Sequence, residues 1–272
     1  MAEEKNPTVT TVELLRMKEK GERIVALTCY DALFARLLDA SGIDILLVGD
    51  SVNQVLAGAP STLSATLDQM IYHTRMVRRG VERAMVVCDM PFLTYQVTPE
   101  DAVRNCGRAM QETGCHAIKL EGGQPMAATV RRLVDVGIPV MGHIGLTPQS
   151  VHALGGYRVQ GRDDVAAERL KADAKALEEA GAFAVVLELI PAPLSSQITK
   201  SLTIPTIGIG AGPACDGQVL VVHDMLGLND RFSAKFVKKY AALAEDVQEA
   251  ARRFAAEVRE GRFPGPDHSF GK

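Results

Sequence analysis

The feature that most constrains this chain is a regular alternation of short apolar runs with amphipathic stretches, which continues over most of its length. The runs are four to seven residues long and rich in β-branched side chains. They comprise residues 24–30, 44–49, 84–88, 117–120, 139–143, 184–189, 206–209 and 219–223. Because the runs are continuously apolar, we expect strands that are covered on both faces by helices. The pattern therefore predicts eight repeated strand–helix units around a parallel sheet.

Helix boundaries are marked most clearly between the third and fourth runs. Thr98 offers an N-cap, Pro99 suits the first helical position, and the acidic residues that follow favour the positive end of a helix dipole. Gly114 is expected to end this helix. The glycines expected to end other helices in the same way are Gly42, Gly137 and Gly181.

Eight strand–helix units can form a closed (β/α)8 TIM barrel or a doubly wound open sheet, and periodicity alone leaves both possible. The glycine-rich segment after the seventh run favours the barrel. Gly208, Gly210 and Gly212 are followed by Pro213, which differs from the G-x-G-x-x-G fingerprint of dinucleotide-binding sheets. We interpret this segment as a tight turn at the end of a strand.

We predict one domain over residues 1–272, since this length fits a single α/β barrel. The barrel should occupy about residues 24–228, with an N-terminal helix over 10–20 and one or two C-terminal helices over 233–260. Residues 210–218 separate the last two runs and are too few for an ordinary crossover helix. The eighth unit is therefore either abbreviated or assigned wrongly.

Composition and charge argue against several classes of partner. Lys and Arg number 30 against 33 Asp and Glu, with a net charge of −3 and no basic stretch, so we expect no nucleic-acid partner. The apolar runs are too short for a bilayer, and the start of the chain has no apolar signal core, so we expect no membrane partner. Five cysteines without a C-x-x-C pair indicate a reducing, cytoplasmic setting. The cysteines expected to pack as small core hydrophobes are Cys29, Cys88, Cys106 and Cys115.

Polar and charged residues gather where the predicted strands end, which is where parallel α/β barrels carry their active sites. These residues are Asp50, Ser51, Asp89, Lys119, Glu121, His143, Glu188, His223 and Asp224. Several carboxylates converging on one axis would repel each other by about several kcal/mol per pair at an effective dielectric of about 20. Lys119 can compensate one of them. A hard divalent cation would compensate the rest, and Mg²⁺ is preferred because it needs few carboxylates besides water.

The strand-end residues differ in the roles that we assign to them. Asp50 and Asp89 are the first choices as metal ligands, with Glu121 bound directly or through water. Glu188 lies in an otherwise apolar run, a setting that suits a general base. For His143 two interpretations remain open, a functional side chain or a cap on its own strand.

Other candidates are assigned ordinary structural roles. A single Asp after a strand is usually a helix N-cap or a loop residue, and Asp31 and Asp224 are interpreted in this way. His73 is at a helical spacing and is expected on the surface.

Six segments resemble the ketopantoate hydroxymethyltransferase family, and the similarity extends over about residues 10–260. They are Leu-Thr-Cys-Tyr-Asp at 27–31, Leu-Val-Gly-Asp-Ser at 47–51, Asp-Met-Pro-Phe at 89–92, Ala-Ile-Lys-Leu-Glu-Gly at 117–122, Gly-His-Ile-Gly-Leu-Thr-Pro-Gln at 142–149 and Ile-Gly-Ile-Gly-Ala-Gly at 207–212. The closing Cys-Asp-Gly-Gln at 215–218 and His-Asp-Met-Leu at 223–226 resemble the same family. Motifs of this length are specific.

The resemblance implies a reaction and a set of ligands. A one-carbon unit would pass from the co-substrate 5,10-methylenetetrahydrofolate to 3-methyl-2-oxobutanoate, giving 2-dehydropantoate in the first step of pantothenate synthesis. The fold would be a barrel of the phosphoenolpyruvate/pyruvate type. One Mg²⁺ per subunit is expected, and homo-oligomers, commonly decamers, are implied.

The resemblance also assigns residues. It implies that Asp50 and Asp89 hold the metal, with Glu121 completing or supporting the site, and that Glu188 accepts the proton. It implies substrate contacts from Ser51, Asp89 and Lys119, to which we add Asp50 and His143 as expected contacts of our own.

Two other functions are compatible with such a barrel. A Mg²⁺-dependent carbon–carbon lyase or mutase is the alternative enzyme, but it is expected to carry a reactive cysteine in a Lys-Lys-Cys-Gly-His type of loop, which this sequence lacks. A binding or scaffold protein is expected to have lost the strand-end acids, and these are present.

Overall fold

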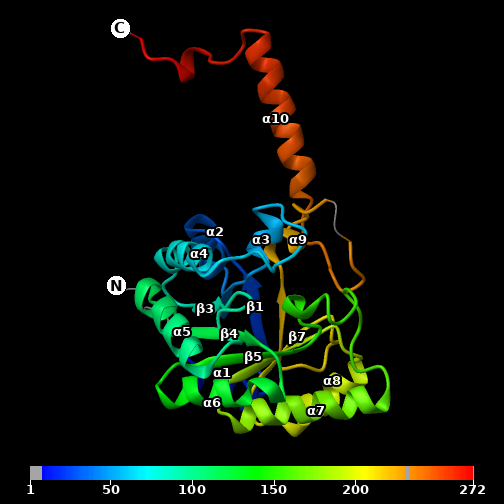
Figure 1. Ribbon diagram of the computed structural model, residues 1–272. Coiled ribbons are helices and arrows are strands. Elements are labelled where there is room, and N and C mark those ends of the chain that lie inside the picture. Colours follow the sequence, from blue (N-terminus) through cyan, green and yellow to red (C-terminus); the bar gives the residue numbers. More distant parts are fainter. Residues whose placement is uncertain (1–7, 231–232, 272) are drawn as a thin grey trace. The chain divides into compact units, whose positions relative to one another are not determined.

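Eight parallel strands close into a barrel in the order in which they occur along the chain (Figure 1). The computed structural model describes residues 8–230 and 233–271. The strands are β1 (Ile24–Thr28), β2 (Ile45–Val48), β3 (Met85–Asp89), β4 (Ala117–Glu121), β5 (Val140–Gly145), β6 (Ala184–Glu188), β7 (Thr206–Ile209) and β8 (Gly217–Leu220). Parallel pairing of β1 with β8 completes the circle, and the (β/α)8 barrel is confirmed.

Helices follow most of the strands and pack around the outside of the barrel (Figure 1). Those up to β8 are α1 (Thr11–Lys20), α2 (Ala32–Ala40), α3 (Val52–Val55), α4 (Leu67–Arg79), α5 (Pro99–Thr113), η1 (Gln124–Met126), α6 (Ala127–Asp135), η2 (Pro148–Ser150), α7 (Asp164–Glu179) and α8 (Ala192–Ser201). The predicted boundaries of α5 are confirmed, because the Thr98 side chain accepts from Asp101 N and Gly114 ends the helix at φ +68°.

The chain divides into two compact units, of which the first ends at Val221 and the second begins at Val222. Elements of the second unit are α9 (Val222–Met225), α10 (Leu243–Arg259) and η3 (Pro266–His268). None of the helices in the described ranges is long and apolar enough to cross a membrane. That residues 1–272 form one domain stays a prediction.

The interior of the barrel is built from alternate residues of each strand, because successive side chains point to opposite faces of a sheet. The buried apolar residues of this cluster in the strands are Ile24, Ala26, Ile45, Leu47, Met85, Val87, Ala117, Met141, Ala184, Val186, Ile207 and Val219. Val9 and Leu14, from the segment that precedes β1, belong to the same cluster. The same period of two reaches Asp89, Lys119, Glu121, His143 and Glu188 at the carboxyl ends of the strands. The alternation that builds the core therefore also directs these polar side chains toward the barrel axis.

Most predicted runs coincide with the strands to within two residues at each end, but the last one was wrong. The prediction placed a strand over 219–223, whereas β8 begins at Gly217 and ends at Leu220. A Cβ on residue 217 would lie 2.5 Å from Ile24 O, so the strand begins with a glycine that lies against β1 and that a search for apolar runs overlooks. His223 and Asp224 consequently lie on α9, not at a strand end.

The abbreviated eighth unit is confirmed, since residues 210–216 form a turn without a helix. Gly210 and Gly212 adopt positive φ values of +62° and +82° there, as the interpretation of a tight turn requires. The prediction for 233–260 needs a correction, because one helix, α10, is present and residues 233–242 are not helical. His73 also differs from expectation, since it is half-buried and its Nδ1 lies 2.8 Å from Tyr30 O.

Helix α1 is fastened to the end of the barrel opposite the carboxyl ends of the strands by one ammonium group. Lys18 Nζ donates to Thr199 O at 3.1 Å, to Ile204 O at 2.9 Å and to Asp216 Oδ2 at 3.0 Å. The Asp216 carboxylate also accepts from Thr206 N at 2.8 Å, at the start of β7. Lys18 thus joins α1 to the segments that enter β7 and β8.

Replacing Lys18 is expected to destabilise the protein. The Lys18→Met change keeps the apolar stem but removes the three hydrogen bonds, two of them to backbone carbonyls. We expect the free energy of unfolding to fall by about 2–4 kcal/mol, measured by urea denaturation. The matched control is Lys20→Met on the same helix, whose exposed ion pair with Glu22 spans 3.9 Å and should contribute less than about 0.5 kcal/mol. Equal losses in the two variants would contradict the fastening role of Lys18.

Candidate active site

The polar cluster at the carboxyl end of the barrel is built on a buried ion pair between neighbouring strands. Lys119 Nζ donates to Asp89 Oδ1 at 2.7 Å and to Oδ2 at 2.8 Å. Both side chains are buried, with 5% and 3% of their surface exposed. Burial disfavours the ammonium, but the Asp89 and Glu121 carboxylates outweigh it and raise the pKa of Lys119. Lys119 is therefore a cation on the barrel axis.

His143 lies between two carboxylates. Its Nδ1 is 3.5 Å from Glu121 Oε1, and its Nε2 is 3.1 Å from Glu188 Oε2. Burial and Lys119 oppose a charge on the imidazole, but Glu121 and Glu188 outweigh them and raise its pKa to about 9. Neither ring nitrogen makes a hydrogen bond to the backbone among the described residues, so the interpretation of His143 as a cap on its own strand is wrong. A functional role for His143 stays a prediction.

Glu188 is more exposed than the apolar run around it suggested. Its side chain is 16% exposed, whereas the Glu121 side chain is 3% exposed. The reason is its place at the end of β6, where the chain turns through Leu189 at φ +46°. A partly open carboxylate beside an imidazolium can reach a bound ligand, so the role of general base remains open to it.

Asp50 is the carboxylate with the least compensation in the cluster. It is 4% exposed, and its backbone N donates to Asp89 Oδ2 at 3.3 Å. Burial, followed by the charges of Asp89 and Glu121, raises its pKa well above the usual range. A further cation beside Asp50 would offset the cost of its negative charge.

Ser51 follows Asp50 and is half-buried. Its Oγ is hydrogen-bonded to the hydroxyl of Tyr30 at 2.9 Å. Asp31, which was assigned a structural role, is confirmed as the N-cap of α2, because its Oδ1 accepts from Phe34 N at 2.9 Å. The predicted site residues from β2 to β6 thus gather at one end of the barrel, whereas Asp31 caps a helix.

Gln149, in the loop after β5, ends the Gly-His-Ile-Gly-Leu-Thr-Pro-Gln motif but is not among the predicted site residues. Its backbone N donates to Glu121 Oε2 and its Nε2 to Asp50 Oδ2, both at 2.9 Å. Nε2 also donates to Met90 O at 2.9 Å, and the Tyr95 hydroxyl donates to Oε1 at 2.7 Å. Gln149 therefore holds two acidic side chains without adding a charge, Asp50 through its side-chain amide and Glu121 through its backbone N. The Gly-His-Ile-Gly-Leu-Thr-Pro-Gln motif could have indicated Gln149, but no sequence signal marked Tyr95.

The charges of the cluster fit a divalent cation. The carboxylates of Asp50, Asp89, Glu121 and Glu188 outnumber the cations Lys119 and His143. Glu121 Oε1 is buried and accepts no hydrogen bond among the described residues. In that part of the chain no three His, Cys, Asp or Glu side chains converge as a ready metal cage. Mg²⁺ is commonly held by one or two carboxylates with waters and substrate, so a hard oxygen-liganded ion suits this donor set.

Comparison with known proteins identifies the family. The model of the family described as ketopantoate hydroxymethyltransferase matches residues 8–266. The chain belongs to the ketopantoate hydroxymethyltransferase family. It is 56% identical over 266 residues to the 3-methyl-2-oxobutanoate hydroxymethyltransferase of Syntrophus aciditrophicus (strain SB), covering 98% of each chain. It is 54% identical over 273 residues to the protein of the same name from Pelodictyon phaeoclathratiforme (strain DSM 5477 / BU-1), covering 99% of each.

Solved structures with a similar fold include two barrel enzymes. A 2,3-dimethylmalate lyase of the PEP mutase/isocitrate lyase superfamily has a TM-score of 0.61 at 20% identity, covering 97% of this chain and 93% of that one. A phosphonopyruvate hydrolase has a TM-score of 0.63 at 14% identity, covering 97% of this chain and 92% of that one. At such identities the likeness concerns the fold, which agrees with the predicted phosphoenolpyruvate/pyruvate type of barrel.

The two aspartates should respond in opposite ways to removal of their charge. Asp50→Asn relieves repulsion by Asp89 and Glu121, so the free energy of unfolding should stay unchanged or rise by about 1 kcal/mol. Asp89→Asn leaves buried Lys119 without its ionic partner, so the free energy should fall by about 3 kcal/mol. Each variant is compared with the unchanged protein by urea denaturation in the presence of a chelator. The same loss in both variants would contradict this description of the charges.

Proposed function

We propose that this family member transfers a hydroxymethyl group from 5,10-methylenetetrahydrofolate to 3-methyl-2-oxobutanoate, giving 2-dehydropantoate and tetrahydrofolate. The observation that carries the proposal is the buried cluster of acids with Lys119 and His143 at the strand ends. It occurs in a chain that is 56% identical to a protein named for this reaction. Such a cluster suits removal of a proton next to a carbonyl group.

One Mg²⁺ per subunit is part of the proposal. Asp50 and Asp89 would hold it, with Glu121 bound directly or through water, and the raised pKa of Asp50 indicates where positive charge is needed. A phosphonopyruvate hydrolase with a similar fold is described in complex with oxalate and Mg²⁺, at 13% identity and a TM-score of 0.59. When bound, the ion would polarise the 2-oxo acid and make the C–H bond beside its carbonyl more acidic.

The chain's own residues then position the 2-oxo acid. Ser51 would hold its carboxylate, and His143, which the neighbouring acids keep cationic, would hydrogen-bond near the same group. Asp50 and Asp89 complete the substrate contacts. Lys119 lies on the barrel axis, where its ammonium can stabilise negative charge that develops on the carbonyl oxygen.

Glu188 takes the proton from C3 of 3-methyl-2-oxobutanoate in this mechanism. Its carboxylate is the most exposed of the acids in the cluster, and it lies 3.1 Å from His143 Nε2. A water molecule supplies the hydroxyl oxygen. It adds to the methylene carbon of the folate, opened as an iminium, and the C–N bond then breaks with its electron pair returning to the folate nitrogen, which releases tetrahydrofolate and leaves the one-carbon unit as formaldehyde. The enolate carbon attacks the formaldehyde carbon, and the resulting alkoxide takes a proton to become the hydroxyl group of 2-dehydropantoate.

A lyase or mutase of the superfamily is less well supported. Its expected reactive cysteine has no counterpart here, because all five cysteines are free and buried. Burial raises the pKa of Cys29 and Cys106 to about 12, which disfavours the nucleophilic thiolate. The proposed transferase needs no thiolate.

The setting of the enzyme is also a proposal. We place it in the cytoplasm, where cysteines remain reduced, as a homo-oligomer that the family resemblance implies to be a decamer. An apolar stripe on α10 supports self-association. Val247, Phe254 and Val258 are 58%, 56% and 46% exposed and follow a helical spacing on one face.

Metal removal tests the proposed ion. Exhaustive dialysis against a chelator should lower the rate of 2-dehydropantoate formation by at least about 100-fold, because polarisation by the ion contributes several kcal/mol. Added Mg²⁺ should restore the rate of the unchanged protein. Asp50→Ala should lower the rate, and added Mg²⁺ should not restore it. The thermal midpoint of each sample shows whether the fold persists. Full activity after chelation would refute the metal assignment.

Exchange of the C3 proton of 3-methyl-2-oxobutanoate into D₂O, without folate, tests the proposed base. With Glu188→Gln we expect the exchange to slow by about 10²–10⁴, because Glu188 is the most exposed acid of the cluster, while metal-dependent binding of the 2-oxo acid persists. The matched control is Glu179→Gln, the same change at an exposed position of α7. If Glu188→Gln exchanges the C3 proton at the normal rate and His143→Gln does not exchange it, then His143 and not Glu188 is the general base.

A further inference from the structure

A pocket of about 590 Å³ extends outward from the acidic cluster, between the loops after β3, β4 and β5 and the first half of α7. Its inner end includes Glu121 and Gln149, which belong to the cluster. The remaining lining residues take no part in the proposed chemistry. The pocket therefore offers room for a second ligand beside the 2-oxo acid.

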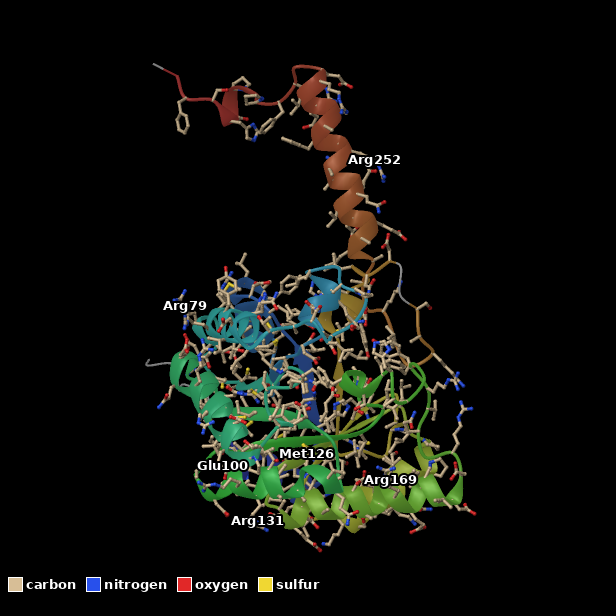
Figure 2. All side chains as sticks on the ribbon, in the orientation of Figure 1. Arg79, Glu100, Met126, Arg131, Arg169 and Arg252 are labelled. Carbon is tan, nitrogen blue, oxygen red and sulfur yellow. The ribbon has the colours of Figure 1, made fainter. Side chains whose placement is uncertain are left out.

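The walls of this pocket are largely apolar. Side chains that line it include Phe92, Met126, Ile144, Leu154 and Leu170. Figure 2 marks Met126, near the start of α6, and Arg169 on α7, both of which line the pocket. A flat, largely apolar ring system is the kind of group that such walls bind by contact area.

A buried carboxylate without a cation lies in the same pocket. Asp173, on α7, is 8% exposed, and its Oδ1 accepts from Gln124 N at 2.7 Å. A Cβ on Gly123 would lie 2.3 Å from the same oxygen, so the loop after β4 lies directly against this carboxylate. Within the described residues, Oδ2 accepts no hydrogen bond and no cationic side chain lies within 4.0 Å.

A carboxylate oxygen is an acceptor only, and Asp173 lines the pocket, so a bound ligand can donate to its free Oδ2. The amino and ring N–H groups of a 2-aminopyrimidinone edge are donors of this kind. Asp173 thus points to a nitrogen heterocycle with donors on one edge.

A free cation lies one helical turn away. Arg169 lines the pocket, is exposed, and has no hydrogen bond or ion pair among the residues that the structure describes. Its guanidinium suits a carboxylate on the outer part of a ligand.

We propose that this pocket binds the reduced folate, with the pterin ring between the apolar walls, its N–H edge at Asp173 and its glutamate carboxylates at Arg169. The inference rests on the proposed function, which requires a folate beside the 2-oxo acid. Contact of the pocket with Glu121 and Gln149 brings the bound folate next to the acidic cluster.

Calorimetric titration with tetrahydrofolate, on the full chain with Mg²⁺, tests this placement. Asp173→Asn keeps the acceptor for Gln124 N but puts an NH₂ group where the ligand brings donors. We expect its Kd for tetrahydrofolate to rise about 10- to 100-fold, the loss of a charge-assisted hydrogen bond, while its Kd for 3-methyl-2-oxobutanoate stays unchanged. A general disturbance of the fold would weaken the binding of both ligands.

Three further variants sharpen the test. Ala166→Leu fills the pocket from a half-buried helical position. It should also weaken the binding of tetrahydrofolate and leave the binding of 3-methyl-2-oxobutanoate unchanged. Arg169→Ala should weaken tetrahydrofolate but not a tetrahydropterin that lacks the glutamate. The matched control is Asp163→Asn, since Asp163 also accepts a backbone N–H, from Ala166 at 2.9 Å, but does not line the pocket.

The outcomes separate the two proposals. If the unchanged protein forms 2-dehydropantoate while Asp173→Asn and Ala166→Leu bind tetrahydrofolate normally, the pocket is assigned wrongly and the proposed function stands. If the unchanged protein forms no 2-dehydropantoate, the proposed function fails and the folate assignment fails with it.

Discussion

Strand register controls the electrostatics of this protein, because the ionic partners at the barrel mouth are also register partners in the sheet. Asp89 of β3 pairs with Lys119 of β4, and Glu121 of β4 pairs with His143 of β5. A slip by one residue would turn each of these side chains to the opposite face of the sheet, away from its partner. The closed barrel prevents such a slip, since every strand is held by two neighbours. The buried charges thus depend on the backbone hydrogen bonds for their compensation.

A neutral amide completes this arrangement. The side-chain amide of Gln149 donates to Asp50, its backbone N donates to Glu121, and its side-chain oxygen accepts from Tyr95 and Gln96. An ammonium at the end of this side chain would cancel negative charge, whereas the amide orients Asp50 and leaves its charge available. Direction and charge are therefore supplied by different residues in this site, the first by Gln149 and the second by Lys119 and His143.

Much of this site could be predicted from the sequence, because the inward positions of a parallel barrel follow a period of two. Lys119 and Glu121 could be assigned once the fourth run was recognised as a strand. The hydrogen bonds of Gln149 could not, since they depend on how the loop after β5 folds back over three strands. Asp173 was not foreseen either, because nothing in the sequence of an amphipathic helix shows that one of its acids lies against Gly123. The early start of β8 was missed because a glycine at a close approach between strands resembles a loop residue.

The pairing of β1 with β8 has a consequence for how the chain acquires its structure. Ile24 is opposite Gly217, so β1 cannot pair with β8 until almost two hundred further residues have been synthesised. Until then β1 exposes an unpaired edge, which is the kind of surface that associates with other chains. Contacts of such sequence separation slow folding because a long loop must be closed first. During synthesis most of this protein therefore leaves the ribosome before β1 can pair with β8. In that interval the exposed edge of β1 favours aggregation over folding.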